Sequence, residues 1–525
     1  MIWFAALVGA AVCGTLLWQR LFAPLPPLEV SLWYWHQPFR ILPQEAAEWK
    51  ALGVRQLFVQ AGSFRKDASG IHMALPQIWE TAGNGLAVHL VFHLDGSLAQ
   101  EFSTLDLQAL ETPLLDGIRR EREAAEHTGV KVAGVQLDFD CPTRQLPKYA
   151  DLLRDVRKAV ASESCALSIT ALPTWYGSRL VDAPLAQVDF AVPQYYEPEL
   201  PKSLDKFATV SRLSLVEHGL RAAGRQGAPF YAGLPVYGHS LLYDAQGQLA
   251  GTYHRMGALD AFRHPAFRLA RAFGADANGA PATPETAIGE TLYDFVAVAP
   301  AKSGRGVGFH LVYDLPTPTL LARHLALVRA QRPRNCRGVI LFRYPEARET
   351  ATLPLPTLQA VLQGKTPHPQ LKVEIQARAL PWEQIETGRK VERAPQELAL
   401  TVTNVGKAAT ALGPDAVTVT LLMDRPGIAD LSAGDADSVE TFSNESRDVS
   451  DVSPGQRVGL LRANVVRFHK LCLMPGESVK FGPLRLPADS AAQAQGSWSV
   501  ADPDHFIRIT GAIAPTPLAR EAQRP

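Results

Sequence analysis

The stretch GVQLDFDCP, residues 134–142, places Gln136, Asp138 and Asp140 at alternate positions of an apolar run. Alternate side chains of a strand share one face, so these three polar groups are expected to point the same way. An unpaired buried carboxylate is costly, so acids in such a strand are expected to be paired or hydrated. Two neighbouring carboxylates shift each other's proton affinity, which suits acid/base chemistry. A structural ion pair with an inward Arg343 is the alternative.

The run that holds these acids is the fourth of eight apolar runs that alternate with helical segments between residues 29 and 362. Such alternation is typical of a parallel sheet covered by helices. The predicted strands are residues 29–36, 54–61, 86–95, 132–140, 166–173, 187–197, 229–238 and 337–345. The predicted helices include residues 42–52, 114–129 and 146–160, the last with apolar residues at helical spacing.

Eight strands with helices between them predict an α/β fold, a (β/α)8 TIM barrel over residues 29–365. An open doubly wound sheet is the alternative, but no glycine-rich phosphate turn follows the first strand. Barrel enzymes keep their catalytic groups at the carboxyl ends of the strands, where Asp140 is expected. The barrel prediction therefore places the polar trio at its mouth.

Two further regions of sequence depart from the alternating pattern. Residues 239–316 read as an insertion after the seventh strand, with a hairpin around Gln246–Gly247 and a strand at 306–316. Residues 366–515 hold short alternating strands between Gly, Pro, Asn and Asp turns, which predicts a C-terminal all-β sandwich of immunoglobulin type. Its predicted strands are residues 371–380, 396–406, 415–423, 477–486 and 505–513. The tail, 516–525, is expected to be disordered.

The N-terminal segment, residues 1–28, combines an apolar run with a proline-rich spacer. No charged side chain precedes Arg20, and the run approaches the roughly 20 apolar residues that a membrane-spanning helix needs. We interpret it as a membrane anchor, with a cleaved signal peptide as the alternative. A protein that is anchored or exported in this way is expected in a bacterial periplasm or cell envelope.

Composition excludes several classes of function. Lys plus Arg and Asp plus Glu both number 52, so no net field favours nucleic acid. The five cysteines are scattered without CxxC spacing, which argues against a disulfide framework or a zinc site. His36, His89 and His93 are candidates for metal ligands, but the first predicted strand ends without acids beside them. We therefore predict neither a metal nor another cofactor.

The polar strand resembles a segment of glycoside hydrolase family 18, the chitinase-like barrels, as a divergent bacterial branch. The fourth strand of that family ends in Asp-Gly-x-Asp-x-Asp-x-Glu, and residues 133–140 read Ala-Gly-Val-Gln-Leu-Asp-Phe-Asp. Asp138 matches the last Asp and Asp140 takes the place of the acid, while Ala133 and Gln136 replace the other two acids.

Two more segments carry the resemblance. GLPVYGHSL, residues 233–241, is similar to the Gly-x-Pro-x-Tyr-Gly segment of the family's seventh strand, and an insertion follows in both. VDFAVPQYYE, residues 188–197, is similar to the sixth-strand segment that ends Met-x-Tyr-Asp. That match places Gln194 at the Met, Tyr196 at the Tyr and Glu197 at the Asp.

The resemblance implies a glycoside hydrolase-like protein that acts on β-linked polysaccharide or oligosaccharide. Asp140 is then the general acid, Asp138 its electrostatic partner, and Tyr196 a hydrogen-bond donor to the substrate. Three possibilities stay open: a glycosidase with altered geometry, a two-carboxylate mechanism, and a barrel that binds glycan without cutting it. In the third case the chain is a polysaccharide-binding or envelope assembly protein. Flat aromatic rings suit sugar faces. The predicted substrate-binding residues are Gln136, Gln194, Glu197, Trp35, Trp175 and Tyr237.

Overall fold

The computed structural model describes residues 25–161, 165–196, 200–207, 209–276, 281–282, 287, 289–300, 306–380, 394–443, 457–489, 491, 493–504 and 506–518. Residues 1–24 of the predicted anchor, Glu197 and residues 519–525 of the predicted tail lie outside the described residues. None of the helices in the described part of the chain is long and apolar enough to cross a membrane.

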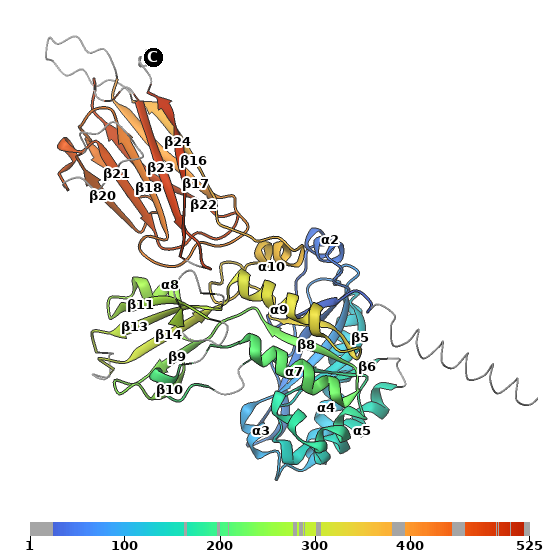
Figure 1. Cartoon of the computed structure of the whole chain (residues 1–525). Helices are drawn as coiled ribbons and strands as arrows, with labels where there is room; N and C mark the ends of the chain where they lie inside the picture. Colours follow the sequence, from blue (N-terminus) through green and yellow to red (C-terminus); the bar gives the residue numbers. More distant parts are fainter. Residues whose placement is uncertain are drawn as a thin grey trace, which may run out of the picture.

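Eight parallel strands close into a barrel, as the alternation of apolar runs predicts (Figure 1). The pairing order is β1-β15-β8-β7-β6-β5-β4-β2, and β1 also pairs with β2, which closes the ring and excludes an open sheet. The barrel strands are β1 (Glu29–Tyr34), β2 (Gln56–Asp67), β4 (Ala87–Leu94), β5 (Lys131–Asp138), β6 (Ala166–Ala171), β7 (Phe190–Pro193), β8 (Phe230–Pro235) and β15 (Cys336–Phe342). Each overlaps one of the eight predicted strands.

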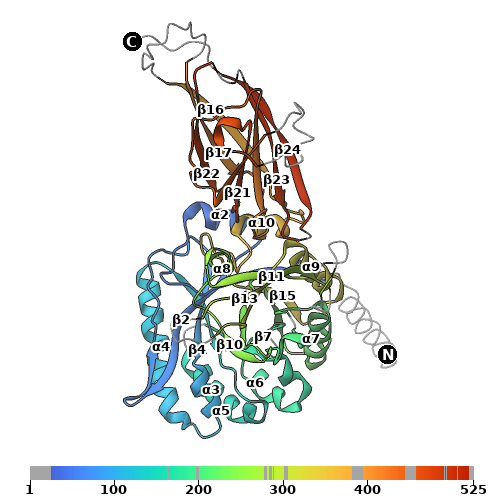
Figure 2. The same ribbon diagram turned by 90° about the vertical axis from the view of Figure 1, so that its left-hand side faces the viewer.

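Helices cover the outside of the barrel, and Figure 2 shows α4, α5 and α7 along its outer wall. The apolar stripe of α5 packs inward, with Leu152, Val156 and Val160 buried. A short strand, β3 (Gly70–Ala74), pairs antiparallel with β2 where a regular barrel would have a helix. The α-helices around the barrel are α2 (Pro43–Ala51), α3 (Gly96–Glu101), α4 (Leu107–His127), α5 (Leu146–Ala161), α6 (Asp182–Leu185), α7 (Leu213–Gln226), α9 (Pro318–Gln331) and α10 (Leu355–Leu362).

Short 3-10 helices occur in the connections and lie beside several of the residues considered below. They are η1 (Thr143–Gln145), η2 (Pro173–Gly177), η3 (Arg179–Val181), η4 (Leu204–Lys206) and η6 (Leu460–Arg462). The turn η1 begins directly after Pro142 and leads into α5. It therefore follows the polar end of β5.

The interior of the barrel is filled by large side chains that form a core of their own. Its buried members are Trp33, Phe58, Val91, Phe190, Val192, Tyr231 and Ile340. They come from six strands, and Trp35 and Phe342 pack against them from nearer the carboxyl ends of the strands. The barrel is thus closed below its mouth, as expected for inward-pointing layers of side chains.

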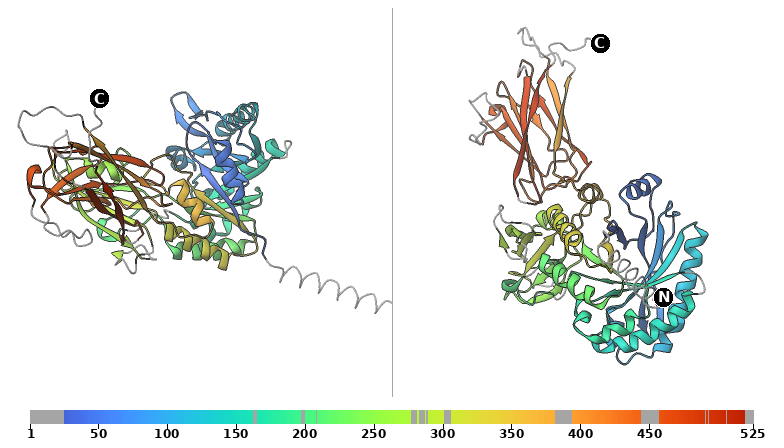
Figure 3. Two further views of the ribbon diagram at one scale, coloured as in Figure 1. Left: turned by 90° about the horizontal axis from the view of Figure 1, so that it is seen from above. Right: turned by 45° about the vertical axis from the view of Figure 1, so that its right-hand side comes forward.

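A second sheet is formed between β8 and α9, within the residues predicted as an insertion. It is antiparallel, with the order β10-β9-β14-β13-β11-β12. Figure 3 shows it beside the barrel, below the C-terminal strands. Its elements are β9 (Ser240–Tyr243), β10 (Leu249–Thr252), α8 (Ala258–Arg263), β11 (Phe267–Ala275), β12 (Pro281–Ala282), β13 (Thr291–Ala297) and β14 (His310–Leu315).

The C-terminal part of the chain forms two antiparallel sheets around a shared apolar core. Their orders are β16-β17-β22-β19 and β20-β21-β18-β23-β24. The strands are β16 (Leu371–Ala379), β17 (Gln396–Asn404), β18 (Val417–Met423), β19 (Asp430–Leu431), β20 (Ser438–Phe442), β21 (Val465–Lys470), β22 (Ser478–Leu486), β23 (Gln493–Ala501) and β24 (Arg508–Pro517). The immunoglobulin type and the domain limits stay predictions.

Polar contacts connect the C-terminal sheets to the rest of the molecule. Thr319 Oγ1, in the first turn of α9, donates to Asp504 at 2.8 Å, and the Leu412 amide donates to the Tyr293 hydroxyl at 2.9 Å. A cavity of about 50 Å³ lies at this junction, lined in part by Tyr293, Leu412 and Cys472. Cys472 is a free thiol, as are the other three described cysteines.

Candidate functional site

Asp138 is the last residue of β5 and lies almost buried at the carboxyl end of the barrel. Its Oδ1 accepts a hydrogen bond from Thr170 Oγ1 at 2.7 Å, and Gln194 Nε2 lies 3.5 Å from the same oxygen. Its Oδ2 lies 2.9 Å from Nδ1 of His93. Residues beside three other strands, β4, β6 and β7, therefore hold this carboxylate in one orientation.

His93 lies near the end of β4, and 33% of its side chain is exposed. The ring meets Trp35 edge to face, with 6.2 Å between the ring centroids. Burial opposes the charged form of His93, but the hydrogen bond and charge of Asp138, with the charges of Asp140 and Asp95, outweigh it. The pKa of His93 is consequently raised, and Asp138 and the partly exposed His93 form a hydrogen-bonded dyad.

Asp140 is exposed and lies beyond the end of β5. The predicted strand extended to residue 140, but the chain turns after Asp138, and the Cys141 amide donates to the Phe139 carbonyl at 2.9 Å. Pro142, which follows, has no amide to continue the ladder. The strand therefore ends two residues earlier than predicted, and Asp140 is an exposed residue of the following turn whose charge acts on His93. Its inward direction stays a prediction.

Aromatic side chains gather around Phe342 at the end of β15. Tyr196 stacks on Phe342 with 5.8 Å between the centroids, and Tyr237 and Trp35 meet it edge to face at 5.2 and 5.5 Å. Three of the predicted site residues are thus brought together. Phe342 itself was missed, although it alternates with the inward Ile340 in the predicted eighth strand.

Two predicted substrate-binding residues lie where no ligand at the mouth reaches them. Gln136 is 0% exposed, because it accepts from Trp33 Nε1 at 2.7 Å in the layer below Asp138. Trp175 is 1% exposed and donates to the Cys141 carbonyl at 3.0 Å, outside the barrel. Burial therefore corrects both assignments, while Gln194 and Tyr237 are partly exposed as a binding role requires.

The two histidines that share a face of β4 lie in different surroundings. His89 stacks on Phe58 with 4.5 Å between the centroids, and its Nε2 lies 3.0 Å from Gln56 Oε1. Burial lowers the pKa of His89 to about 4, so it is neutral inside the barrel. Among the described residues, no three His, Cys, Asp or Glu side chains are grouped to hold a metal ion.

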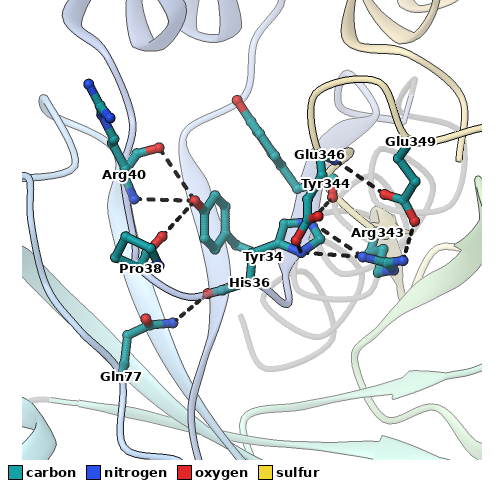
Figure 4. Close-up of polar contacts among 9 residues, drawn as sticks. All are labelled: Tyr34, His36, Pro38, Arg40, Gln77, Arg343, Tyr344, Glu346 and Glu349. Atoms are coloured by element: carbon teal, nitrogen blue, oxygen red, sulfur yellow. Dashed lines mark hydrogen bonds and ion pairs between the residues drawn. The ribbon is translucent and has the colours of Figure 1, made fainter. Parts of the chain in front are cut away.

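A second polar cluster lies at the ends of β1 and β15 (Figure 4). Its members are His36, Arg343, Glu346 and Glu349. His36 Nδ1 lies 2.8 Å from Glu346, its Nε2 contacts the Tyr344 carbonyl, and Arg343 pairs with Glu349. Arg343 is therefore paired with Glu349 at the end of β15. The alternative interpretation required Arg343 to form an ion pair with the acids of β5, and the ion pair of Arg343 with Glu349 argues against it. The cluster connects the two strands that carry Trp35 and Phe342.

A buried acidic pair supports the segment that follows Tyr196. Asp314 on β14 accepts from the Val210 amide at 2.8 Å, and Glu290 accepts from the Ser211 amide at 3.0 Å. Burial, and then the charge of Asp314, raise the pKa of Glu290. No pattern in the sequence indicates this pair, because both acids lie in the predicted insertion, far along the chain from Val210 and Ser211.

A family model described as "Domain of unknown function (DUF3142)" matches residues 85–258, which include His93, Asp138, Asp140 and Tyr196. Comparison with curated proteins gives no match.

Among solved structures, the chain is similar to the spore cortex-lytic enzyme SleL of Bacillus megaterium, with 14% identity and a TM-score of 0.43 over 66% of this chain and 75% of that one. The spore cortex-lytic enzyme SleL of Bacillus cereus is 17% identical, with a TM-score of 0.42 over 65% of this chain and 75% of that one. A chitinase from Chromobacterium violaceum is 14% identical, with a TM-score of 0.40 over 64% of this chain and 98% of that one. The closed barrel itself is established by the strand pairing.

Proposed function

We propose that the mouth of the barrel binds and hydrolyses a β-linked polysaccharide or oligosaccharide. The observation that carries the proposal is the Asp138–His93 dyad beside a group of aromatic side chains, at the end of the barrel where barrel enzymes keep their catalytic residues. Partly exposed rings such as those of Trp35 and Tyr237 suit the apolar faces of sugars. The resemblance of three sequence segments to chitinase-like barrels supports the same substrate class.

Hydrolysis of a glycosidic bond needs a proton donor, and it needs negative charge near the positive anomeric carbon of the transition state. Asp138 and Asp140 supply that charge from the end of β5 and the turn after it. The hydroxyl of Tyr196 is the proposed hydrogen-bond donor to the substrate. It is buried beside Tyr237 and Phe342, so a substrate reaches it only when these neighbours move. Gln194, at the end of β7, is a proposed substrate contact, and Glu197, which lies outside the described residues, keeps the same role as a prediction.

A specific observation also favours a second function, binding of envelope polysaccharide without cleavage. Both oxygens of Asp138 are engaged, one by Thr170 and the other by His93. A carboxylate restrained in this way can position a ligand without taking part in bond cleavage. In this function Asp140 supplies only charge.

Turnover on a panel of β-linked oligosaccharides separates the two functions. Wild type is compared with Asp138→Asn and Asp140→Asn, and with Asp151→Asn on the outer face of α5 as a matched control. Hydrolysis by wild type and the control, lost in Asp138→Asn, supports the hydrolase. Binding without product in all four proteins supports the second function, and neither binding nor product rejects both.

The proposal also keeps the predicted site of action, a bacterial periplasm or cell envelope reached through the apolar N-terminal residues. Fractionation of cells that produce the full chain tests it. Recovery of the protein with the membrane or in the periplasm supports the assignment, and recovery in the cytosol alone contradicts it.

A further inference from the structure

We infer that His93 is the proton donor of this site, the role that the sequence resemblance gives to Asp140. The inference rests on the proposed hydrolysis and deepens it, because it names the group that protonates the leaving oxygen. It is carried by the position of His93 between the buried Asp138 and the exposed surface of the mouth.

The geometry leaves one ring nitrogen of His93 for a ligand. Nδ1 is engaged by Asp138 at 2.9 Å, and Asp138 is in turn fixed by Thr170 at 2.7 Å. Trp35 restrains the ring from the β1 side. A third of the side chain is exposed, so Nε2 is the nitrogen that a bound substrate meets. A histidine oriented by a carboxylate on its other nitrogen is a common arrangement for proton transfer.

The charges that face His93 all favour its protonated form. Asp138 on β5, Asp140 in the turn after β5 and Asp95 after β4 raise its pKa, against the effect of burial. Trp35, which meets the ring edge to face, is uncharged. Because a donor works best when its pKa is near the working pH, this surrounding suits a donor at neutral pH.

Asp140 is less well suited to donate the proton. A carboxyl group that acts as a general acid must keep its proton near neutral pH. Burial in an apolar site, or a second carboxylate close beside it, raises its pKa and so retains the proton. Asp140 is exposed and lies in the turn that follows β5. An exposed carboxylate is instead suited to accept a proton from water.

The Nε2 proton of His93 passes to the glycosidic oxygen while the bond from that oxygen to the anomeric carbon breaks, and the bonding electrons leave with the oxygen. A water molecule adds to the anomeric carbon and gives one proton to Asp140. Exchange with solvent moves that proton back to His93, so one water is consumed for each bond and both side chains recover their starting state.

The test compares two substrates of one sugar that differ in leaving group. A natural oligosaccharide needs a proton donor, whereas a dinitrophenyl glycoside has a leaving group acidic enough to depart without one. His93→Gln is expected to lose on the order of 100-fold or more in kcat on the oligosaccharide and much less on the aryl glycoside. His93→Asn is a second variant in case the first does not fold, and His127→Gln, on the exposed end of α4, is the control.

Each outcome bears on the inference. Equal loss on both substrates shows a structural role and overturns the assignment, as does no loss on either. A loss confined to the oligosaccharide in Asp140→Asn, with His93→Gln unaffected, assigns the donor to Asp140. If wild type cleaves neither substrate, the hydrolase proposal itself fails, and the inference fails with it.

A second measurement needs no substrate. The imidazole of His93 is titrated by nuclear magnetic resonance in the full chain, selectively labelled on histidine, in wild type and in Asp138→Asn. The titration midpoint is expected to fall in the variant, since Asp138 supplies the largest of the favourable interactions. An unchanged midpoint would show that Asp138 does not set the protonation of His93 and would overturn the inference.

Discussion

Nδ1 of His93 lies 2.9 Å from Oδ2 of Asp138, although the two residues are 45 positions apart in the chain. They are direct neighbours in the parallel pairing of β4 with β5. Because residues in register on adjacent strands lie on the same face of the sheet, both side chains point to the barrel interior. The register of β4 and β5 therefore brings His93 and Asp138 together, and the neighbours of the pair determine its orientation and its protonation.

Thr170 is the residue that fixes the other side of Asp138. The change Thr170→Val keeps the shape of the side chain but removes the hydroxyl that donates at 2.7 Å. Because the hydrogen bond is buried and ends on a carboxylate, the free energy of unfolding is expected to fall by about 1–3 kcal/mol. Urea denaturation of the full chain measures the change.

The control for Thr170 is Thr104→Val, which removes an exposed hydroxyl bonded to the Glu101 carbonyl. Its effect is expected to stay within about 0.5 kcal/mol. Equal destabilisation by the two changes would contradict a hydrogen bond to Asp138 that contributes to stability.

Trp35 and Trp175 were predicted to share a function, and the structure separates them. Trp35 is partly exposed beside Phe342, so Trp35→Ala is expected to weaken glycan affinity roughly tenfold, about 1.4 kcal/mol. Trp175 is buried against Tyr149, so Trp175→Ala is expected to lower the free energy of unfolding by about 3–5 kcal/mol. Calorimetric titration with the bound oligosaccharide and urea denaturation measure the two effects. A loss of affinity from both changes, at equal stability, would restore the original assignment.

Sequence reasoning located the barrel strands and the polar end of β5, because alternation of apolar and polar residues determines which face is buried. It did not find the partner of Asp138, since that depends on which residue of β4 lies beside it in register. The predicted strand was extended to Asp140 because the pattern cannot show that β5 ends two residues earlier. Trp175 was misplaced for a related reason, as the chain turns into η2 directly after Leu172. Local pattern thus determined the strands, and long-range packing determined the site.

Asp504 connects the C-terminal sheets to α9. Its carboxylate accepts from the Thr319 amide at 3.2 Å and from Thr319 Oγ1 at 2.8 Å, in the first turn of the helix. Removal of an acceptor at a helix N-terminus typically costs about 1 kcal/mol, and Asp504→Ala is expected to destabilise the protein by about 1–2 kcal/mol. Differential scanning calorimetry of the full chain measures it, with the exposed Asp430→Ala as control. An unchanged transition temperature in Asp504→Ala would show that this contact contributes nothing.

Glu290 and Asp314 make the stability of the segment after Tyr196 depend on pH. Burial and the charge of Asp314 raise the pKa of Glu290 in the folded protein, whereas the unfolded chain has an ordinary value of about 4.3. The folded state therefore holds this proton more tightly. The stabilisation from this proton is fully present below about pH 4.3 and is lost as pH rises through the pKa of Glu290 in the folded protein. The loss is about 1.4 kcal/mol for each unit by which the folded pKa exceeds the unfolded pKa.

Glu290→Gln removes the titrating group and keeps an oxygen that accepts from the Ser211 amide. The variant is expected to match wild type near pH 4 and to become the more stable protein as pH rises toward 8. Urea denaturation of both proteins at each pH gives the difference in unfolding free energy, in which the titration of groups that do not interact with Glu290 cancels. The same difference at every pH would mean that Glu290 ionises alike in the folded and unfolded chains. In that case the buried acidic pair could not be what links proton binding to the segment behind the site.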